Sequence, residues 1–228
     1  NTADCFGGEE HGMTKGENNR TEIHYNEGIY VGYRYFDTFN VTPRFEFGYG
    51  LSYTTFDTEI LSVSADENNV SVQVKVTNTG NRYSGKEVVQ VYFSAPDGKL
   101  EKAYQELAAY GKTDTLAPGE SQTLTLSYAT DSMKAYDEEL AAYIMEAGDY
   151  IIRVGNSSRN TTVAAVLKLD ETKIVEQLSN MCTQDEINLD LISKKGVSPY
   201  TYEGEAEEIA AAPIIKISSE TIKFENNA

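Results

Sequence analysis

Residues 70–76 read Val-Ser-Val-Gln-Val-Lys-Val, with valine at every second position and a polar residue between each pair. In a pleated strand, alternate side chains point to opposite faces of the sheet. Strict alternation of this kind therefore predicts a strand with one buried face and one solvated face. The run 78–81, Asn-Thr-Gly-Asn, follows the valines and is suited to form a turn because its residues tolerate positive φ.

Six further stretches have the composition of strands and are separated by turn residues. They are residues 53–63, 88–93, 104–110, 124–128, 150–154 and 161–169. About seven short strands at regular spacing predict a mainly β fold, namely an antiparallel β-sandwich.

Tyr150 has a structural interpretation in such a sandwich. It follows the turn residues Gly148 and Asp149 and opens an alternating strand near the end of the predicted sandwich. In immunoglobulin-like folds a tyrosine corner occupies this place, and its hydroxyl bonds to backbone a few residues upstream. We therefore interpret Tyr150 as a structural residue and not as a catalytic one.

The chain after residue 169 has a different texture. Asp170 is suited to cap a helix, and three apolar residues with helical spacing follow it: Ile174, Leu178 and Met181. Residues 203–208 contain four glutamates, a pattern that favours a solvated linker. Residues 214–217, Ile-Ile-Lys-Ile, favour a short strand, which needs a sheet to join.

The charge of the chain excludes two classes of partner. Its 228 residues include 36 acidic and 19 basic side chains, which give a net charge of −17. Nucleic acids and anionic membranes both attract clustered basic residues, so we expect neither as a partner. No run reaches the roughly 18 apolar residues that a membrane-spanning helix needs. The given chain shows no signal-peptide pattern, which favours the cytoplasm slightly over secretion.

We expect no metal and no cofactor. Cys5 and Cys182 are too few and too far apart in sequence for a zinc site. The sequence contains neither a Walker-type phosphate loop nor a Gly-x-Ser-x-Gly elbow. With two histidines in the chain, a catalytic triad has few ways to form.

Residues 7–12, Gly-Gly-Glu-Glu-His-Gly, favour a loop in which Glu9, Glu10 and His11 suit acid–base chemistry or ligand binding. The alternative is a surface loop in a chain that is already rich in acids. We keep Glu9 and His11 as residues adjacent to substrate, as a hypothesis, and assign no catalytic residue.

Eleven aromatic residues lie between positions 25 and 56. Such rings either stack on sugars or are buried between packed domains, since each removes a large apolar area from water. The chain has no tryptophan, the largest flat ring, which weakens the sugar interpretation. We therefore favour packing against a neighbouring domain.

Two stretches carry a family resemblance: residues 27–37, EGIYVGYRYFD, and residues 45–56, FEFGYGLSYTTF. They closely resemble motifs of glycoside hydrolase family 3, the β-glucosidase-like enzymes. In that family these motifs close an α/β sandwich domain and lead into a fibronectin type III-like domain. Four shorter motifs match the latter domain, at residues 76–80, 85–92, 116–120 and 148–150. The likeness covers about residues 22–168.

The resemblance implies three parts. Residues 1–50 are the end of the α/β sandwich domain, residues 51–169 are the fibronectin type III-like β-sandwich, and residues 170–228 are a helix, an acidic linker and a strand-like tail. The catalytic carboxylates of the family lie in a (β/α)8 barrel domain and in the α/β domain, and neither surrounding motif occurs here. The resemblance thus implies a non-catalytic portion of an enzyme that hydrolyses terminal β-linked sugars.

The partners implied are the barrel and α/β sandwich domains of the same enzyme, together with an oligosaccharide or glycoside substrate. The alternative is a free-standing β-sandwich module that binds carbohydrate or protein. The aromatic residues discriminate between the two. A free module has to expose its rings or bury them within itself, whereas part of an enzyme buries them against a neighbouring domain.

Overall fold

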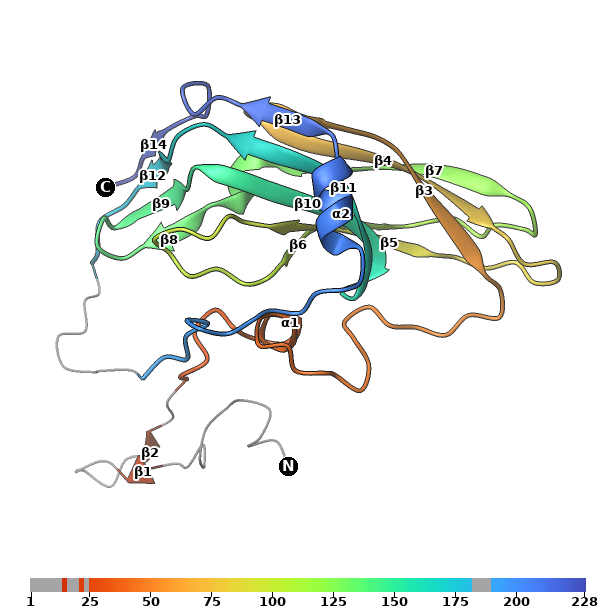
Figure 1. Ribbon diagram of the computed structural model, residues 1–228, viewed down its shortest axis with the longest axis horizontal. Coiled ribbons are helices and arrows are strands. Elements are labelled where there is room, and N and C mark those ends of the chain that lie inside the picture. The colour runs from red at the N-terminus through yellow and green to blue at the C-terminus, as the bar shows by residue number, and fades with distance from the viewer. Residues whose placement is uncertain (1–13, 16–20, 23–24, 182–189) are drawn as a thin grey trace.

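The computed structural model describes residues 14–15, 21–22, 25–181 and 190–228, and a β-sandwich forms its centre (Figure 1). One sheet has the order β3-β4-β7, with β3 at Phe56–Ala65, β4 at Asn69–Asn78 and β7 at Ser121–Ala129. The facing sheet contains β5 (Val88–Ser94), β6 (Glu106–Lys112), β10 (Gly148–Ser157) and β11 (Asn160–Leu169). The antiparallel sandwich of seven strands that the sequence predicts is confirmed.

The valines of β4 form the centre of the core, as their alternation predicts. Val70, Val72, Val74 and Val76 are completely buried and belong to one apolar cluster with residues of β5, β10 and β11. Burial of each such side chain stabilises the fold by about 1.5–3 kcal/mol. The polar residues between the valines lie on the outer face, where Ser71 accepts a 2.9 Å hydrogen bond from the Ser127 hydroxyl of β7.

A second, smaller sheet replaces the helix predicted after Asp170, and that prediction is wrong. The sheet has the order β14-β12-β9-β8, with β8 at Ala135–Asp137, β9 at Ala142–Met145, β12 at Lys173–Gln177 and β14 at Glu225–Asn226. In β12, Ile174 lies opposite Ile144 of β9, and Val175 is buried. β-Branched residues suit a strand, and pairing with β9 outweighs the helical spacing of the apolar residues.

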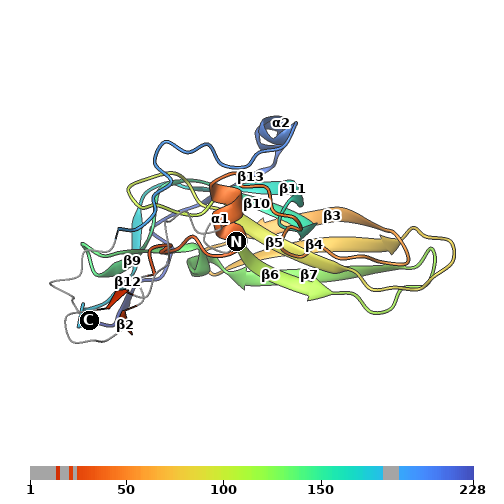
Figure 2. The same cartoon turned by 90° about the horizontal axis from the view of Figure 1, so that it is seen from below.

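Residues 190–228, here called the C-terminal segment, return along the sandwich. They contain α2 (Glu205–Ala211) and β13 (Ile214–Ile217). The predicted strand is confirmed, because β13 adds to the edge of the larger sheet in parallel with β11. Figure 2 shows α2 outside that sheet, on the side of β11 and β13.

The solvated linker predicted at residues 203–208 is also wrong. Glu205 opens α2 and is 7% exposed. Its carboxylate lies 2.8 Å from a guanidinium nitrogen of Arg153 in β10, which compensates the buried charge.

Asp170 holds the C-terminal segment in place. Its carboxylate accepts hydrogen bonds from the Ser219 amide at 2.8 Å and the Ser218 hydroxyl at 3.1 Å. The bonds from Ser219 come first among the causes that lower the pKa of Asp170 to about 2. The contact is therefore complete above the ordinary pKa of 3.8 and is lost as the pH falls toward 2.

We expect the NMR resonance of the Ser219 amide to titrate with a midpoint near pH 2. In Asp170→Asn the titration should disappear. A midpoint near 3.8 in the unsubstituted chain would contradict the assignment.

The remaining described elements are short. β1 (Thr14–Lys15) pairs with β2 (Thr21–Glu22), α1 spans Tyr33–Thr38, and a 3₁₀ turn spans Thr130–Met133. Among the residues that the structure describes, no helix is long and apolar enough to cross a membrane.

Candidate functional site

Residues 25–56, here called the aromatic segment, run along one side of the sandwich from before α1 to the start of β3 (Figure 1). Its inner rings pack on the sandwich. Tyr30 and Tyr35 are 1% and 8% exposed. Tyr33 stacks on Phe47, with 5.1 Å between ring centroids, and meets Tyr92 of β5 edge to face at 5.8 Å.

A buried ion pair fixes α1 to the sandwich. The Arg159 Nε donates to the Asp37 carboxylate at 2.8 Å, and the Gln105 amide donates to its other oxygen at 3.2 Å. Asp37 is 1% exposed, and burial raises the pKa of its carboxyl above 3.8 although the bonds from Arg159 and Gln105 oppose that effect. The Arg159 guanidinium also lies 4.3 Å from the ring centre of Tyr200 in the C-terminal segment.

Hydrogen bonds to backbone hold the rest of the aromatic segment. The Tyr33 hydroxyl accepts from the Leu107 amide at 2.8 Å, and the Thr38 hydroxyl accepts from the Tyr104 amide at 2.9 Å. The Ser158 amide donates to the Phe47 carbonyl at 2.8 Å. These contacts involve the β6 strand, the loop before it and the β10–β11 turn, so the segment is fixed at several points.

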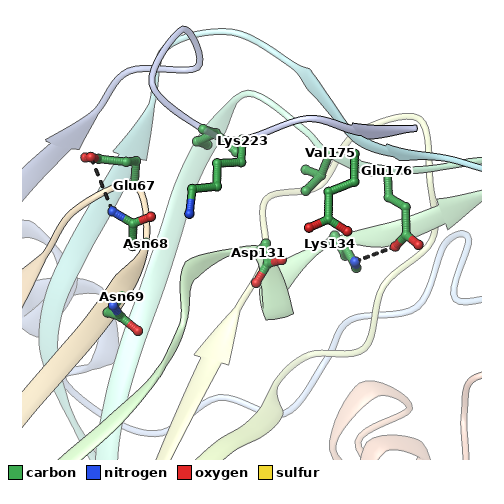
Figure 3. A pocket seen from close by; sticks show the side chains of 10 residues that line it. Glu67, Asn68, Asn69, Asp131, Lys134, Val175, Glu176 and Lys223 are labelled. Atoms are coloured by element: carbon green, nitrogen blue, oxygen red, sulfur yellow. Dashed lines mark hydrogen bonds and ion pairs between the residues drawn. The ribbon is translucent and has the colours of Figure 1, made fainter. Parts of the chain in front are cut away.

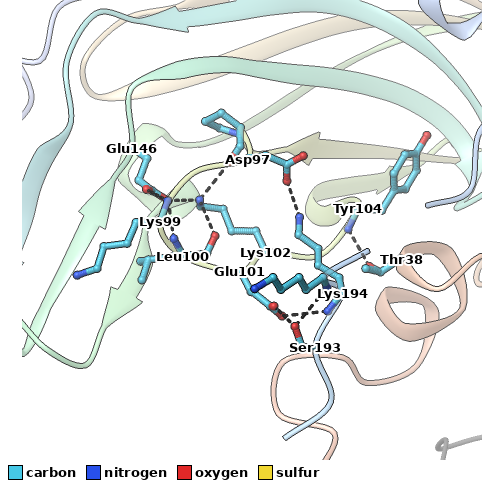
Figure 4. Close-up of polar contacts among 12 residues, drawn as sticks. Thr38, Asp97, Lys99, Leu100, Glu101, Lys102, Tyr104, Glu146, Ser193 and Lys194 are labelled. Atoms are coloured by element: carbon cyan, nitrogen blue, oxygen red, sulfur yellow. Dashed lines mark hydrogen bonds and ion pairs between the residues drawn. The ribbon is translucent and has the colours of Figure 1, made fainter. Parts of the chain in front are cut away.

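The C-terminal segment contacts the same region, as the side chains of Lys194 and Ser193 show (Figure 4). Its Tyr200 amide donates to the Asp37 carbonyl at 2.8 Å. Lys194 reaches the loop at residues 95–105, where its ammonium lies 2.6 Å from Asp97 and its amide donates to Glu101 at 3.2 Å. Glu101 in turn accepts a 2.7 Å bond from the Tyr30 hydroxyl. The segment thus ties the aromatic segment to the sandwich.

Glu146 organises the same loop from the sandwich side (Figure 4). Its carboxylate is paired with the buried Lys102 ammonium and accepts from the Lys99 amide at 2.6 Å. Burial alone would raise the pKa of Glu146, but these bonds outweigh burial and hold the pKa below its usual value. The group is therefore a charged structural anchor.

The outer side of the aromatic segment is apolar and open. Eight of its large apolar side chains are between 46% and 92% exposed, and we call them the outer apolar face: Tyr25, Ile29, Val31, Phe45, Phe47, Tyr49, Leu51 and Tyr53. Exposed apolar side chains in such number are typical of an interaction surface.

A hollow of about 630 Å³ lies within this outer side. The rings of Tyr33, Phe36, Phe45 and Phe47 line it, with Arg44 among its other lining residues. The hollow suits an apolar group, and the positive charge of Arg44 lies beside it.

A second pocket lies at the other end of the sandwich, between the β3–β4 turn and β12 (Figure 3). Its lining is mostly charged and includes an ion pair between Lys134 and Glu176 at 2.7 Å. Within the described residues, no group of three or more metal-ligating side chains is present there or elsewhere. We assign no ligand to this pocket.

The predicted site residues have different outcomes. Glu9 and His11 lie outside the described residues, as do Cys5 and Cys182. Tyr150 is 1% exposed, and its hydroxyl donates to the Glu146 carbonyl at 2.9 Å, which is the bond of a tyrosine corner.

Sequence analysis missed the arginines that hold this region together. Arg153 lies in β10, and Arg159 lies just after it. The alternation in β10 predicts which residues are buried but names no ion-pair partner. The partners, Glu205 and Asp37, are 52 and 122 positions away. No local spacing links such pairs. The density of aromatic residues and the two family motifs at residues 27–37 and 45–56 were the signals that pointed to the region.

Comparison with known proteins shows which families this chain is similar to. Residues 87–158 match the fibronectin type III-like domain family. A β-glucosidase of Ruminococcus albus is 43% identical over 170 residues, which cover 72% of this chain and 18% of that protein. An exo-α-(1→6)-L-arabinopyranosidase of Bifidobacterium breve is 32% identical over 202 residues, which cover 88% of this chain and 26% of that protein.

A solved structure agrees with these sequence matches. The β-glucosidase of Paenibacillus barengoltzii superposes with a TM-score of 0.67 at 45% identity, over 70% of this chain and 19% of that one. The chain therefore spans about a fifth to a quarter of the length of its relatives, which have other domains. Residues 87–158 thus form a fibronectin type III-like domain, and the chain is similar to the corresponding portion of glycoside hydrolase family 3 β-glucosidases.

Proposed function

We propose that this chain is a non-catalytic part of a glycosidase that removes terminal β-linked sugars, and that it braces the catalytic domains. The outer apolar face carries this proposal. Its eight exposed side chains have no cover within the described residues. We assign residues 1–50 to the end of an α/β sandwich domain, 51–169 to the fibronectin type III-like domain, and 170–228 to a tail.

The chemistry of the described acids supports a non-catalytic role. A retaining glycosidase needs two carboxylates about 5–5.5 Å apart on either side of the sugar. The acids that line the hollow are already engaged, since Asp37 is paired with Arg159 and Glu46 accepts from the Ser157 hydroxyl at 3.1 Å. We therefore assign the catalytic carboxylates, as the family resemblance implies, to a barrel domain and to the rest of the α/β domain.

The sandwich contributes a rigid support for the catalytic domains. A catalytic pocket works when its groups are held within a fraction of an ångström of the productive geometry. A sandwich fixed to the aromatic segment by buried ion pairs and backbone bonds offers a stiff surface against which neighbouring domains pack.

The isolated chain, incubated with an aryl β-glucoside, should give no turnover above background. Release of the phenol at a rate that scales with chain concentration would contradict the assignment of the carboxylates elsewhere. The intact enzyme serves as the positive control for the substrate.

Glu9 and His11 remain a proposal as residues near the substrate. In the intact enzyme, Glu9→Gln or His11→Ala should raise KM or change the preference for the leaving group while kcat stays within about tenfold, because neither residue transfers a proton. Glu10→Gln in the same loop is the matched control. Unchanged kinetics in both variants would remove the two residues from the site.

The second candidate is a free-standing binding module, which the aromatic lining of the hollow favours. Titration of cello-oligosaccharides into the isolated chain in a calorimeter separates the two. Binding that Phe45→Ala abolishes would support the module, and the proposed enzyme role predicts no binding heat.

A further inference from the structure

The hollow on the outer side of the aromatic segment is fixed before anything binds to it. The Tyr33 hydroxyl and the Phe47 carbonyl each accept a backbone N–H bond from the sandwich at 2.8 Å. The Arg159 guanidinium donates to the carbonyls of Phe36 and Val41 at 3.0 and 2.9 Å. A group that enters a surface held in this way loses little free energy to ordering the receptor.

The charge beside the hollow is unusual for this protein. Arg44 lines the hollow and is exposed, with its guanidinium 5.8 Å from the ring centre of Phe45. Among the described residues it has no ion pair. In a chain of net charge −17, a positive group on an apolar surface selects a partner with a carboxylate at that position.

We infer that the hollow is the receptor for a short cluster of apolar side chains, flanked in sequence by Asp or Glu, from the catalytic domains of the same polypeptide. The inference rests on the proposed function. The occupant follows from chain length and charge. The relatives extend over about four to six times the length that matches this chain, and an apolar hollow beside Arg44 suits an apolar anchor with an acid next to it. Such buried anchors carry most of the energy of an interface.

Photo-crosslinking in the intact enzyme tests the inference. One variant carries p-benzoylphenylalanine in place of Phe45, inside the hollow, and a second carries it in place of Tyr53, on the outer apolar face but outside the hollow. After irradiation, mass spectrometry of the digest identifies the residue attached. We expect position 45 to attach to an apolar residue of the catalytic domains with Asp or Glu within two positions of it.

Crosslinking at positions 45 and 53 distinguishes failure of this inference from failure of the proposed function. A crosslink from 53 to the catalytic domains without one from 45 overturns the receptor and leaves the proposed function standing. Absence of both overturns both. Attachment of position 45 to a second copy, or to this chain alone, also overturns the inference.

A charge reversal tests the acidic flank. Arg44→Glu should lower the crosslink yield at position 45 about threefold, the effect of losing one partly exposed ion pair. Arg82→Glu is the matched control, because Arg82 lies 4.9 Å from the ring of Tyr83 in a similar exposed pair outside the hollow. Equal yields in both variants overturn the assignment of an acidic neighbour.

Discussion

Replacing Arg159 with methionine should lower the free energy of unfolding of the chain by about 3–5 kcal/mol. The substitution keeps most of the apolar stem and removes the charge. It leaves the Asp37 carboxylate, which is 1% exposed, with the Gln105 amide as its remaining side-chain donor. It also removes donors from the carbonyls of Phe36 and Val41. An uncompensated buried charge is among the costliest changes that a fold can suffer.

Arg34→Met is the matched control, measured by urea unfolding alongside Arg159→Met. Arg34 lies in the same helix as Asp37 and pairs with Glu106 at 3.3 Å, but the side chains of Arg34 and Glu106 are each 36% exposed. Solvent screens such a pair, so its loss should cost about 0–1 kcal/mol. Equal losses in the two variants would contradict the role of burial.

The pH dependence of Arg159→Met gives a second readout. Without the guanidinium, desolvation raises the pKa of Asp37 further above its value in the unfolded chain. The folded variant then binds a proton more readily than the unfolded one. The loss of unfolding free energy is therefore greatest when Asp37 is ionised, and it shrinks as the pH falls through the raised pKa of Asp37. Arg159→Met should therefore regain part of its lost stability as the pH falls from neutral through the raised pKa of Asp37.

The strands of the sandwich were predictable because each has a local pattern. In β4, alternation of valine with polar residues corresponds to full burial of every valine. β12 has no such pattern, since its place depends on an open edge of β9 that lies 30 positions earlier in the chain. Helical spacing of Ile174, Leu178 and Met181 is a coincidence that strand pairing outweighs.

The sequence predicted that aromatic rings gather at the candidate site, but not which of the rings point inward. The aromatic segment is largely irregular, so no period of 2 or 3.6 tells which ring points inward. Tyr25 is 67% exposed and Tyr30 is 1% exposed, although both belong to the same run of rings. Likewise, the glutamates at 203–208 look alike in sequence, and Glu205 is the buried one because it meets Arg153 and Tyr104, which are distant in sequence.

Glu205→Gln should release the C-terminal segment and cost about 3 kcal/mol, the loss expected when one partner of a buried ion pair is removed. Arg153 is 2% exposed, and its guanidinium lies 2.8 Å from the Glu205 carboxylate, 3.1 Å from the Ser94 hydroxyl and 5.1 Å from the ring centre of Tyr104. Tyr104 also donates its hydroxyl to Glu205 at 2.5 Å. Glu207→Gln, at an exposed position of the same helix, should cost less than about 0.5 kcal/mol.

A double-mutant cycle distinguishes an ion pair from general damage to the helix. Arg153→Met and Glu205→Met together should cost clearly less than the sum of the two single losses, because the double variant buries no unpaired charge. Trypsin cleavage after Lys194 or Lys195 should accelerate at least about tenfold in each single variant, since opening of the segment exposes that backbone. Additive losses with unchanged cleavage would show that α2 is held by other contacts, such as the 3.0 Å bond from the Val163 amide to Glu208.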